Sequence, residues 1–425
     1  MTRERPDQFP VPGEPAGPSA AGLSQTAAAA SPADLAHRLR AQARQLGFAR
    51  VGIAGVASPP RHAAFVSWLQ AGLAGPMTAW LARQEPLRAD PQMLLPAARS
   101  IVMLATDYDT SPRTPSRHRA VAADGHEVTA APPGHGRVAR YAVGDDYHDL
   151  LRSRLNMLAD WLSEQVPGSA SRGVVDSAPL AERDFGWLAG LGWIGKNTML
   201  ISPQAGSFFF LSAVLTTVDL PPDDPLEVDH CGTCTACLEA CPTDAFPEPR
   251  VLDATRCIAT LTIEDRGPVP ADLREGMGEW VFGCDICQDV CPWNRHAPLV
   301  DEPAFQPRHG EATLPLADLL TLDAAAFRQR FHGSPLLRAK RQGLARSAAI
   351  ALGNAPDPAA AGALATALSD PQPVVRGAAA WALGCWITKG VRAAWAREQL
   401  ALRLEVEDDA AVLAELRDAT GGQRS

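Results

Sequence analysis

The feature that most constrains this chain is a run of closely spaced cysteines. The run CGTCTACLEACP begins at Cys231, and a second run, CDICQDVCP, begins at Cys284. The spacing C-x2-C-x2-C-x3-C-P is that of bacterial two-cluster ferredoxins, in which the fourth cysteine binds the other cluster. The second run lacks one cysteine of the pattern, and Cys257 supplies it. The spacing therefore predicts two 4Fe-4S clusters, the first bound by Cys231, Cys234, Cys237 and Cys291, the second by Cys241, Cys257, Cys284 and Cys287.

Two other cysteine chemistries fit the pattern less well. Zinc ribbons prefer two separated CxxC pairs, and a disulfide scaffold suits a short secreted chain. The ninth cysteine, Cys385, lies in an alanine-rich segment and is interpreted as a small buried hydrophobic residue.

Length and composition indicate a cytoplasmic protein of two or three domains. The chain has 425 residues, of which 46% are hydrophobic and 20% charged. The longest apolar stretch, Phe208 to Leu215, is too short to cross a bilayer, and no secretory segment precedes it. The net charge of -9 argues against a protein that coats nucleic acid indiscriminately, although it permits a local basic patch.

Changes in composition divide the chain into four parts. Residues 1–31 are rich in Pro, Ala, Gly and Ser and are expected to be a disordered leader. Residues 32–224 are expected to form an α/β domain, because short apolar runs read as strands and alternate with helical segments. Within it, residues 110–137 read as a surface insertion. Residues 225–300 hold the cysteines, and residues 301–425 are helical.

Several helix boundaries carry recognisable signals. Ser31 and Pro32 are placed as the N-cap and first residue of a helix that stops at Gly47. The turn 144–146 introduces an amphipathic helix. A short strand ends at Asp176, and a helix is expected to open near Pro179.

The helical part contains an internal repeat. RSAAIALGN at 346–354 recurs as RGAAAWALGC at 376–385, and a less regular acidic unit follows. Because one such unit cannot bury its own apolar face, we expect stacked units similar to HEAT repeats.

The glycine-rich stretch from Gly190 to Asn197, GLGWIGKN, partly matches two nucleotide-binding patterns. Both patterns require a preceding strand, whereas the preceding residues look helical. We therefore expect these glycines to let the backbone approach a large cofactor instead.

Asp176 has two interpretations. A carboxylate at the end of a strand commonly caps a turn or a helix. Alternatively, Asp176 delivers a proton, which requires a pKa well above the usual value, through burial beside apolar groups such as Trp187 and Trp193.

Two further clusters of polar residues have open interpretations. Tyr141, Asp146, Tyr147 and His148 look, on their own, like capping and packing groups. The segment 328–346 has six cations and no acidic residue, so it is either a solvated face or a phosphate-binding surface, and its place before the repeats favours binding.

Taken together, these motifs resemble the epoxyqueuosine reductase family of tRNA-modifying enzymes. The stretches that carry the resemblance are RYAVGDDYHDLLRSRL, VVDSAPLAERDFGWLAGLGWIGKNTMLIS, CGTCTACLEACPTDAF, RCIATLTIE and FGCDICQDVCPWN.

The resemblance implies a cobalamin-dependent reduction of epoxyqueuosine to queuosine at the wobble position of tRNA. It places a base-off cobalamin in the α/β domain beside the two clusters and makes Asp176 the proton donor. The cofactor contacts expected on this basis are Arg140, Tyr141, Asp176, Lys196 and Asn197. The expected tRNA contacts are Arg338, Lys340, Arg341 and Arg346. We expect a monomer that receives electrons from a separate donor and has no contact with a membrane.

Two alternatives remain open at this point. A corrinoid reductive dehalogenase also combines cobalamin with two clusters, but it has no use for a basic helical repeat. A non-catalytic iron-sulfur carrier would bind no corrinoid.

Overall fold

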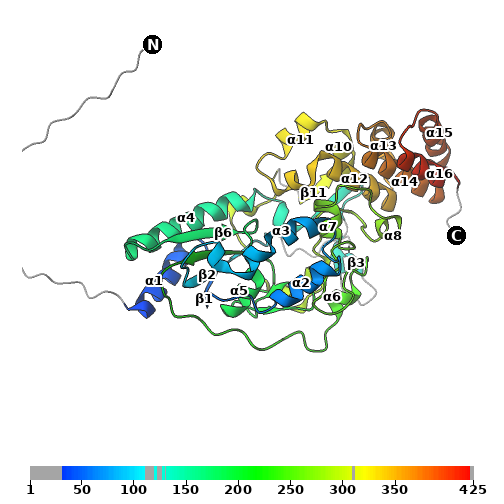
Figure 1. The fold of residues 1–425 in the computed structure, drawn as a ribbon. Coiled ribbons are helices and arrows are strands. Elements are labelled where there is room, and N and C mark those ends of the chain that lie inside the picture. Colours follow the sequence, from blue (N-terminus) through cyan, green and yellow to red (C-terminus); the bar gives the residue numbers. More distant parts are fainter. Residues whose placement is uncertain (1–30, 111–118, 122–126, 130, 309–311, 422–425) are drawn as a thin grey trace, which may run out of the picture.

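The computed structural model describes residues 31–110, 119–121, 127–129, 131–308 and 312–421. The predicted leader, except Ser31, and half of the predicted insertion lie outside the described residues. Figure 1 shows a sheet flanked by helices at one end of the molecule, from which the C-terminal helices extend away. Within the described ranges, no helix has the length and apolar character needed to cross a bilayer.

The N-terminal part is built on a four-stranded sheet in the order β1-β2-β9-β6. Every neighbouring pair in it is antiparallel. Its strands are β1 (Arg50–Gly55), β2 (Ser100–Asp107), β6 (Ser171–Val175) and β9 (Phe209–Thr216). The strands expected around 50–55, 100–107 and before Asp176 are thus confirmed.

The expected α/β layer differs from the sheet in strand direction. Gly55 at the end of β1 pairs with Ser100 at the start of β2, so the chain leaves β1 and enters β2 at the same end of the sheet. The intervening helices α2 (His62–Gln70) and α3 (Thr78–Ala89) pack against each other. This helical hairpin returns the chain to the end of the sheet at which β1 finishes, which makes β1 and β2 antiparallel. A single crossover helix would instead carry the chain to the opposite end and make them parallel.

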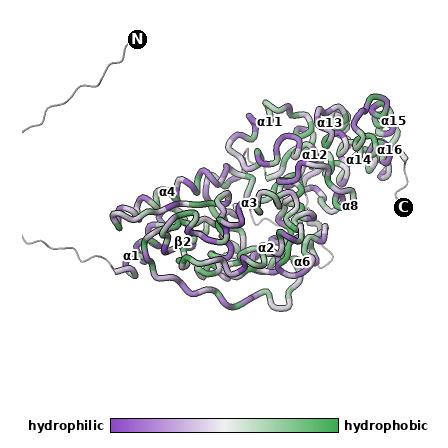
Figure 2. The backbone as a smooth tube through the Cα atoms, viewed as in Figure 1, coloured by the Kyte–Doolittle hydropathy of each residue, from purple (hydrophilic) through white to green (hydrophobic). Residues whose placement is uncertain are grey.

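Helices cover both faces of the sheet. On one face, α1 (Pro32–Gln45) and α4 (Tyr147–Gln165) contribute Leu39 and Leu155 to a buried hydrophobic cluster that also contains Val102. On the other face, α5 (Glu182–Leu188) brings Phe185 against Met103. Every residue of β2 is buried, and Figure 2 shows hydrophobic colour at this strand. The central strand therefore has an apolar run rather than an alternating pattern.

The helix starts follow the predicted caps, with one exception. The Ser31 hydroxyl accepts a hydrogen bond from the Asp34 N–H, and the Asp146 carboxylate accepts one from the His148 N–H at the start of α4. The helix expected near Pro179 begins only at Glu182. Residues 176–181 therefore form a loop between β6 and α5.

The cysteine-rich segment is joined to its neighbours by a second sheet. Its strand β10 (Trp280–Phe282) pairs with β5 (His135–Val138), which also pairs with β11 (Thr313–Pro315). Strand pairing thus crosses the expected boundaries of this segment on both sides. Short helices occupy the rest of it: α6 (Ala236–Glu239), α7 (Ile258–Ile263), α8 (Ala271–Arg274) and α9 (Ile286–Asp289). Two further short strands, β3 (Arg119–Val121) and β4 (Glu127–Thr129), pair with each other.

The C-terminal part is a stack of helices, in which α12 (Lys340–Asn354) packs on α14 (Pro373–Thr388) and α14 packs on α16 (Ala410–Gly421). The two sequence repeats fall within α12 and α14. The other α-helices of the C-terminal part are α10 (Leu316–Thr321), α11 (Ala324–Arg330), α13 (Ala361–Ala367) and α15 (Ala393–Leu404). The first arginine of each repeat, Arg346 and Arg376, is buried.

Candidate active site

A cavity of about 760 Å³ lies where the sheet, the cysteine-rich segment and the first repeat meet. The two sheets contribute an aromatic and aliphatic surface that includes Phe209, Phe210 and Phe282. Helix α3 contributes Trp80 and Arg88, and Met77 lies directly before it. Helix α4 contributes Tyr147 and His148, and the turn 335–339 contributes Leu337 and Arg338. The β6–α5 loop brings Asp176 to the same cavity.

Asp176 is held by two donors from the start of α4. The Tyr147 hydroxyl donates to Asp176 Oδ2 at 2.9 Å. The His148 Nε2 donates to the same oxygen at 3.0 Å, and its Nδ1 donates to Asp146 Oδ1 at 2.7 Å. No hydrogen bond to Asp176 Oδ1 is found among the described residues, so this oxygen is available to a ligand.

The protonation of this network differs from the prediction for Asp176. Burial acts to raise the Asp176 pKa, but hydrogen bonds from His148 and Tyr147 outweigh it and hold the pKa below its usual value. Burial acts to lower the His148 pKa, but its bonds to Asp146 and Asp176 raise it to about 9. The prediction of a raised Asp176 pKa is therefore wrong for the protein without ligands, and the proton resides on His148.

The two tryptophans expected beside Asp176 lie elsewhere. Trp187 donates its indole N–H to the Leu226 carbonyl oxygen, and Trp193 packs against Trp293. The Asp176 side chain is 60% exposed and opens into the cavity. Its apolar surroundings come from residues that are distant in sequence, such as Phe210, which sequence reasoning did not identify.

Of the expected cofactor contacts other than Asp176, Tyr141 lines the cavity. The other three do not. Arg140 is bonded to Asp285 and Asp289, so it joins the N-terminal part to the cysteine-rich segment. These carboxylates occupy the Arg140 guanidinium, which does not line the cavity, and its contact with the cofactor stays a prediction.

Lys196 and Asn197 also bind the cysteine-rich segment. The Lys196 Nζ donates to the carbonyl oxygens of Gly232 and Cys234 at 2.8 and 2.9 Å. The Asn197 amide is buried and donates to the Cys287 carbonyl oxygen at 3.1 Å. Both side chains fix loops that carry cysteines and neither lines the cavity, and their contact with the cofactor stays a prediction.

The glycines of the stretch 190–197 serve packing within the protein. A Cβ atom on Gly192 would lie 2.2 Å from the Ile201 carbonyl oxygen, which belongs to the facing strand. The strands concerned are β7 (Trp193–Ile194) and β8 (Leu200–Ile201). The close approach is thus to another backbone segment, and the expectation of a cofactor there is wrong.

The thiols of the cysteine-rich segment raise one another's pKa values. Burial, with the thiols of Cys291, Cys231 and Cys234, raises the pKa of Cys237 to about 11. Burial also raises the Cys284 pKa, with Cys287 and Cys257 as the thiol neighbours. The second set lies close to the first, because Cys237 also contributes to the raised pKa of Cys287.

The described ranges contain no group of three His, Cys, Asp or Glu side chains close enough to bind a single metal ion. The ligands of a 4Fe-4S cluster surround a larger body than one ion. Cys385, by contrast, lies half-buried on α14, as expected for a packing residue.

The basic island divides into buried and accessible residues. Arg346 is 1% exposed and donates to the carbonyl oxygens of Leu261, Asp265 and Gly267. It cannot contact a phosphate, so this prediction is wrong. Arg341 is engaged by both carboxylate oxygens of Asp370.

Arg338 and Lys340, by contrast, are exposed and line the cavity. The Arg338 guanidinium also bonds Glu264 at 2.9 Å. Lys340 has a φ of 62°, an unusual conformation for a residue other than glycine.

Sequence reasoning missed four charged residues that line the cavity, Arg88, Glu182, Arg183 and Glu264. It also treated Tyr147 and His148 as capping and packing groups. The sequence ERD, directly after the Asp176 loop, could have pointed to Glu182 and Arg183, since residues that follow a catalytic loop commonly support it.

Comparisons with known proteins agree with this site. A family model described as epoxyqueuosine reductase QueG matches residues 88–177, which include Tyr147, His148 and Asp176. A second model, described as a 4Fe-4S double cluster binding domain, matches residues 230–294.

Relatives that match over most of their length are also epoxyqueuosine reductases. The chain is 41% identical to an epoxyqueuosine reductase of Xanthomonas campestris, over 85% of this chain and 99% of the relative. It is 42% identical to that of Pseudomonas aeruginosa, over 76% and 87%.

Solved structures extend the likeness to the fold. An epoxyqueuosine reductase solved with an epoxyqueuosine-modified tRNA stem loop has a TM-score of 0.79 and 30% identity, covering 92% of this chain and 99% of that one. The Bacillus subtilis epoxyqueuosine reductase, solved with its catalytic aspartate loop swung out of the active site, has a TM-score of 0.79 and 29% identity, with the same coverage.

Proposed function

The chain belongs to the epoxyqueuosine reductase family, and we propose that it reduces epoxyqueuosine in tRNA to queuosine. The reaction removes the epoxide oxygen as water and consumes two electrons and two protons. Family membership supports the reaction class, and the relative solved with a modified tRNA stem loop supports the substrate. A tRNA substrate also places the enzyme in the cytoplasm.

The observation that carries this proposal is the position of Asp176. Its carboxylate opens into a cavity whose wall includes Phe282, two residues before the cluster cysteine Cys284. A proton donor and an electron source thus meet at one cavity. An iron-sulfur carrier without catalysis would need no such carboxylate.

The cavity fits the cobalamin that the family resemblance implies. Its volume of about 760 Å³ lies in the upper part of the range for small-molecule binding pockets. The aromatic wall, with Tyr141, Phe210 and Phe282, is suited to the apolar edge and face of a corrin, and we propose that these residues hold it. When bound, cobalamin would supply low-potential cobalt chemistry that no side chain provides.

Two 4Fe-4S clusters fit the cysteine-rich segment, and we assign their ligands as the sequence predicts. The first is bound by Cys231, Cys234, Cys237 and Cys291, the second by Cys241, Cys257, Cys284 and Cys287. The electrostatic grouping of the thiols supports this assignment. The second cluster would lie near the cavity, because Cys284 follows Phe282 of the cavity wall by two residues. Cys234 of the first cluster is exposed, which would suit electron transfer from a separate donor.

Asp176 and His148 together would store a proton and deliver it to the substrate. At neutral pH the proton is stored on the His148 imidazolium, which is fixed by Asp146. Negative charge grows on the departing epoxide oxygen in the transition state, so a proton delivered to this oxygen lowers the barrier. Asp176, ionised at neutral pH, would first take this proton from His148 and then deliver it to the departing oxygen, which leaves the carboxylate ionised again. Tyr147 keeps the carboxylate oriented during this exchange.

We propose that Arg338 and Lys340 contact tRNA phosphates at the mouth of the cavity, where both side chains are accessible. The stacked helices α12, α14 and α16 would form a HEAT-like support beside them. Arg88 and Arg183 line the same cavity from other elements and add to its positive charge. Cations on several sides suit a single nucleotide that is turned out of its loop.

One experiment tests the function. The purified protein, with both clusters reconstituted, is incubated anaerobically with cobalamin, a chemical reductant and tRNA that carries epoxyqueuosine. Mass analysis of the nucleosides is expected to show queuosine, and omission of cobalamin is expected to abolish it. An absence of queuosine with clusters and corrinoid both bound would refute the proposal.

A further inference from the structure

The loop that presents Asp176, residues 176–181, is held in an unfavourable backbone conformation. Asp176 has a φ of +47°, in the left-handed region. This region costs a residue other than glycine about 1 kcal/mol or more. Such a conformation persists only where the surroundings fix it. The contacts that fix the loop therefore decide where the carboxylate points.

Two side chains that the proposed proton chemistry does not use fasten this loop. The Glu182 Oε1 accepts a hydrogen bond from the Asp176 backbone N–H at 2.9 Å. The Arg88 Nη1 donates to the Leu180 carbonyl oxygen at 3.1 Å. One contact holds the first residue of the loop, and the other holds it near its end.

Glu182 can make its contact without adding charge beside Asp176. Burial and the negative charge of Asp176 raise the Glu182 pKa to about 8. At neutral pH the carboxyl group is therefore largely protonated, and its carbonyl oxygen still accepts the Asp176 N–H. Glutamine would reproduce both properties.

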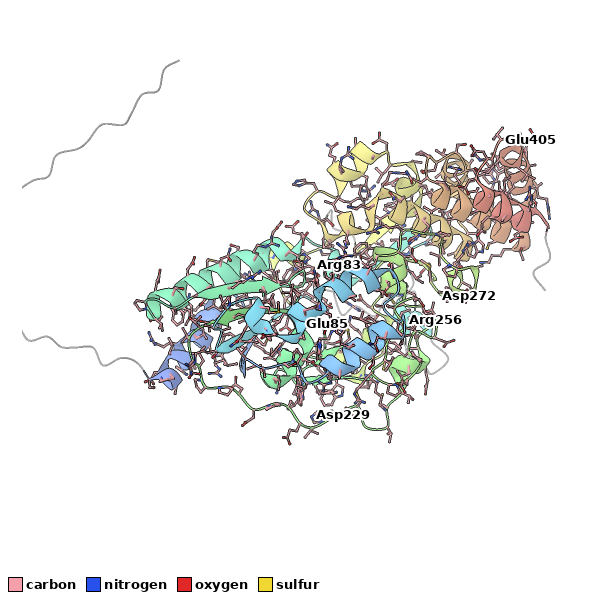
Figure 3. The ribbon with its side chains drawn as sticks, viewed as in Figure 1. Arg83, Glu85, Asp229, Arg256, Asp272 and Glu405 are labelled. Carbon is pink, nitrogen blue, oxygen red and sulfur yellow. The ribbon has the colours of Figure 1, made fainter. Side chains whose placement is uncertain are left out.

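Arg88 connects the loop to a part of the molecule that is itself lightly packed. No residue of α2 or α3 is fully buried. The Arg88 guanidinium lies 6.0 Å from the ring centroid of Phe65 and 5.9 Å from that of Trp80, so it also joins the two helices. Figure 3 labels Arg83 and Glu85 on α3, the helix that carries Arg88.

We propose that Glu182 is a positioning residue for Asp176, and that it holds the Asp176 loop in the cavity wall through the Asp176 backbone N–H, with Arg88 as the second attachment. The inference rests on the proposed function, because it assigns Glu182 to the same reaction. Glu182 acts through Asp176 and exchanges no proton with the substrate.

The test compares Glu182→Ala, Glu182→Gln and the control Glu85→Gln. Glu85 is a carboxylate on α3 that bonds His62 and does not line the cavity. Amide hydrogen exchange of the loop peptide is measured without substrate, and kcat is measured with cobalamin-loaded enzyme. In Glu182→Ala, we expect faster exchange in the loop and a kcat about tenfold lower, which corresponds to about 1.4 kcal/mol. Glu182→Gln and Glu85→Gln should stay close to the wild type in both.

Two results would overturn the inference. Unchanged loop exchange in Glu182→Ala would show that the contact does not hold the loop, whatever the kcat. Equal losses of kcat in the Gln and Ala variants would show that the carboxyl group acts chemically. If Glu182→Ala does not fold, Arg88→Ala provides a second arm, with faster exchange expected at residues 178–181. Failure of the proposed function would appear separately, as a wild-type enzyme that makes no queuosine.

Discussion

The proton stored on His148 should make the stability of the protein depend on pH. Its pKa is raised from an ordinary value of 6.5 to about 9, because burial is outweighed by the bonds to Asp146 and Asp176. A group whose pKa is higher in the folded state stabilises the fold fully below its unfolded value, and this stability is lost as the pH rises through the folded value. The contribution should therefore disappear between about pH 6.5 and pH 9.

The size of this contribution follows from the shift. A shift of this size corresponds to roughly 3 kcal/mol at most, at about 1.4 kcal/mol for each pH unit. Because Asp176 is 60% exposed, solvent screening reduces the contribution to about 2 kcal/mol. We expect His148→Gln to remove this amount at pH 6.5 and almost none at pH 9.5.

Anaerobic denaturant unfolding at both pH values measures the difference between variant and wild type. The control is His37→Gln, at an exposed position of α1. A His148→Gln variant whose deficit is the same at pH 6.5 and pH 9.5 would refute the reasoning, because the imidazolium would then have no favourable interaction in the fold.

Further predictions concern the basic island and the clusters. Arg338→Glu should weaken tRNA binding and reduce the dependence of log Kd on log salt by about one, as a salt titration would show; an unchanged slope contradicts the assignment. Arg346→Ala should instead lower the free energy of unfolding by about 3 kcal/mol, since it leaves three carbonyl oxygens without their donor; wild-type stability in denaturant unfolding would be inconsistent with the burial. Cys291→Ser should remove one cluster from the iron content and the low-temperature electron paramagnetic resonance spectrum, whereas Cys385→Ser should change neither; two intact clusters in Cys291→Ser would exclude its role as a ligand.

Local signals in the sequence predicted much of this structure. The N-caps at Ser31 and Asp146 were identified because a capping side chain bonds an amide a few residues away. The cysteine pattern was informative for the same reason, since a cluster loop is a local structure. The repeat at 346–354 and 376–385 correctly indicated stacked helices, because α12 and α14 bury equivalent apolar faces.

The errors concern contacts between distant segments. Arg346 reads as a surface cation, yet it bonds carbonyl oxygens near residue 265, which the sequence does not place beside it. Lys196 and Asn197 stand in a glycine-rich loop and were predicted to contact the cofactor, while their hydrogen bonds go to cysteine loops further along the chain. Asp176 was identified through the family resemblance, while its protonation depends on His148, whose approach is set by the packing of α4 against β6.

The most direct test of the account compares the wild type with Asp176→Asn in a single turnover. Both proteins are loaded with cobalamin and clusters, reduced, and mixed anaerobically with tRNA that carries epoxyqueuosine; absorption spectra confirm equal loading. Loss of a general acid typically costs a factor of about 100 or more, so the variant should form queuosine at least about 100 times more slowly. Queuosine formation at the wild-type rate by the fully loaded variant would contradict the central claim that Asp176 delivers the proton in this cavity.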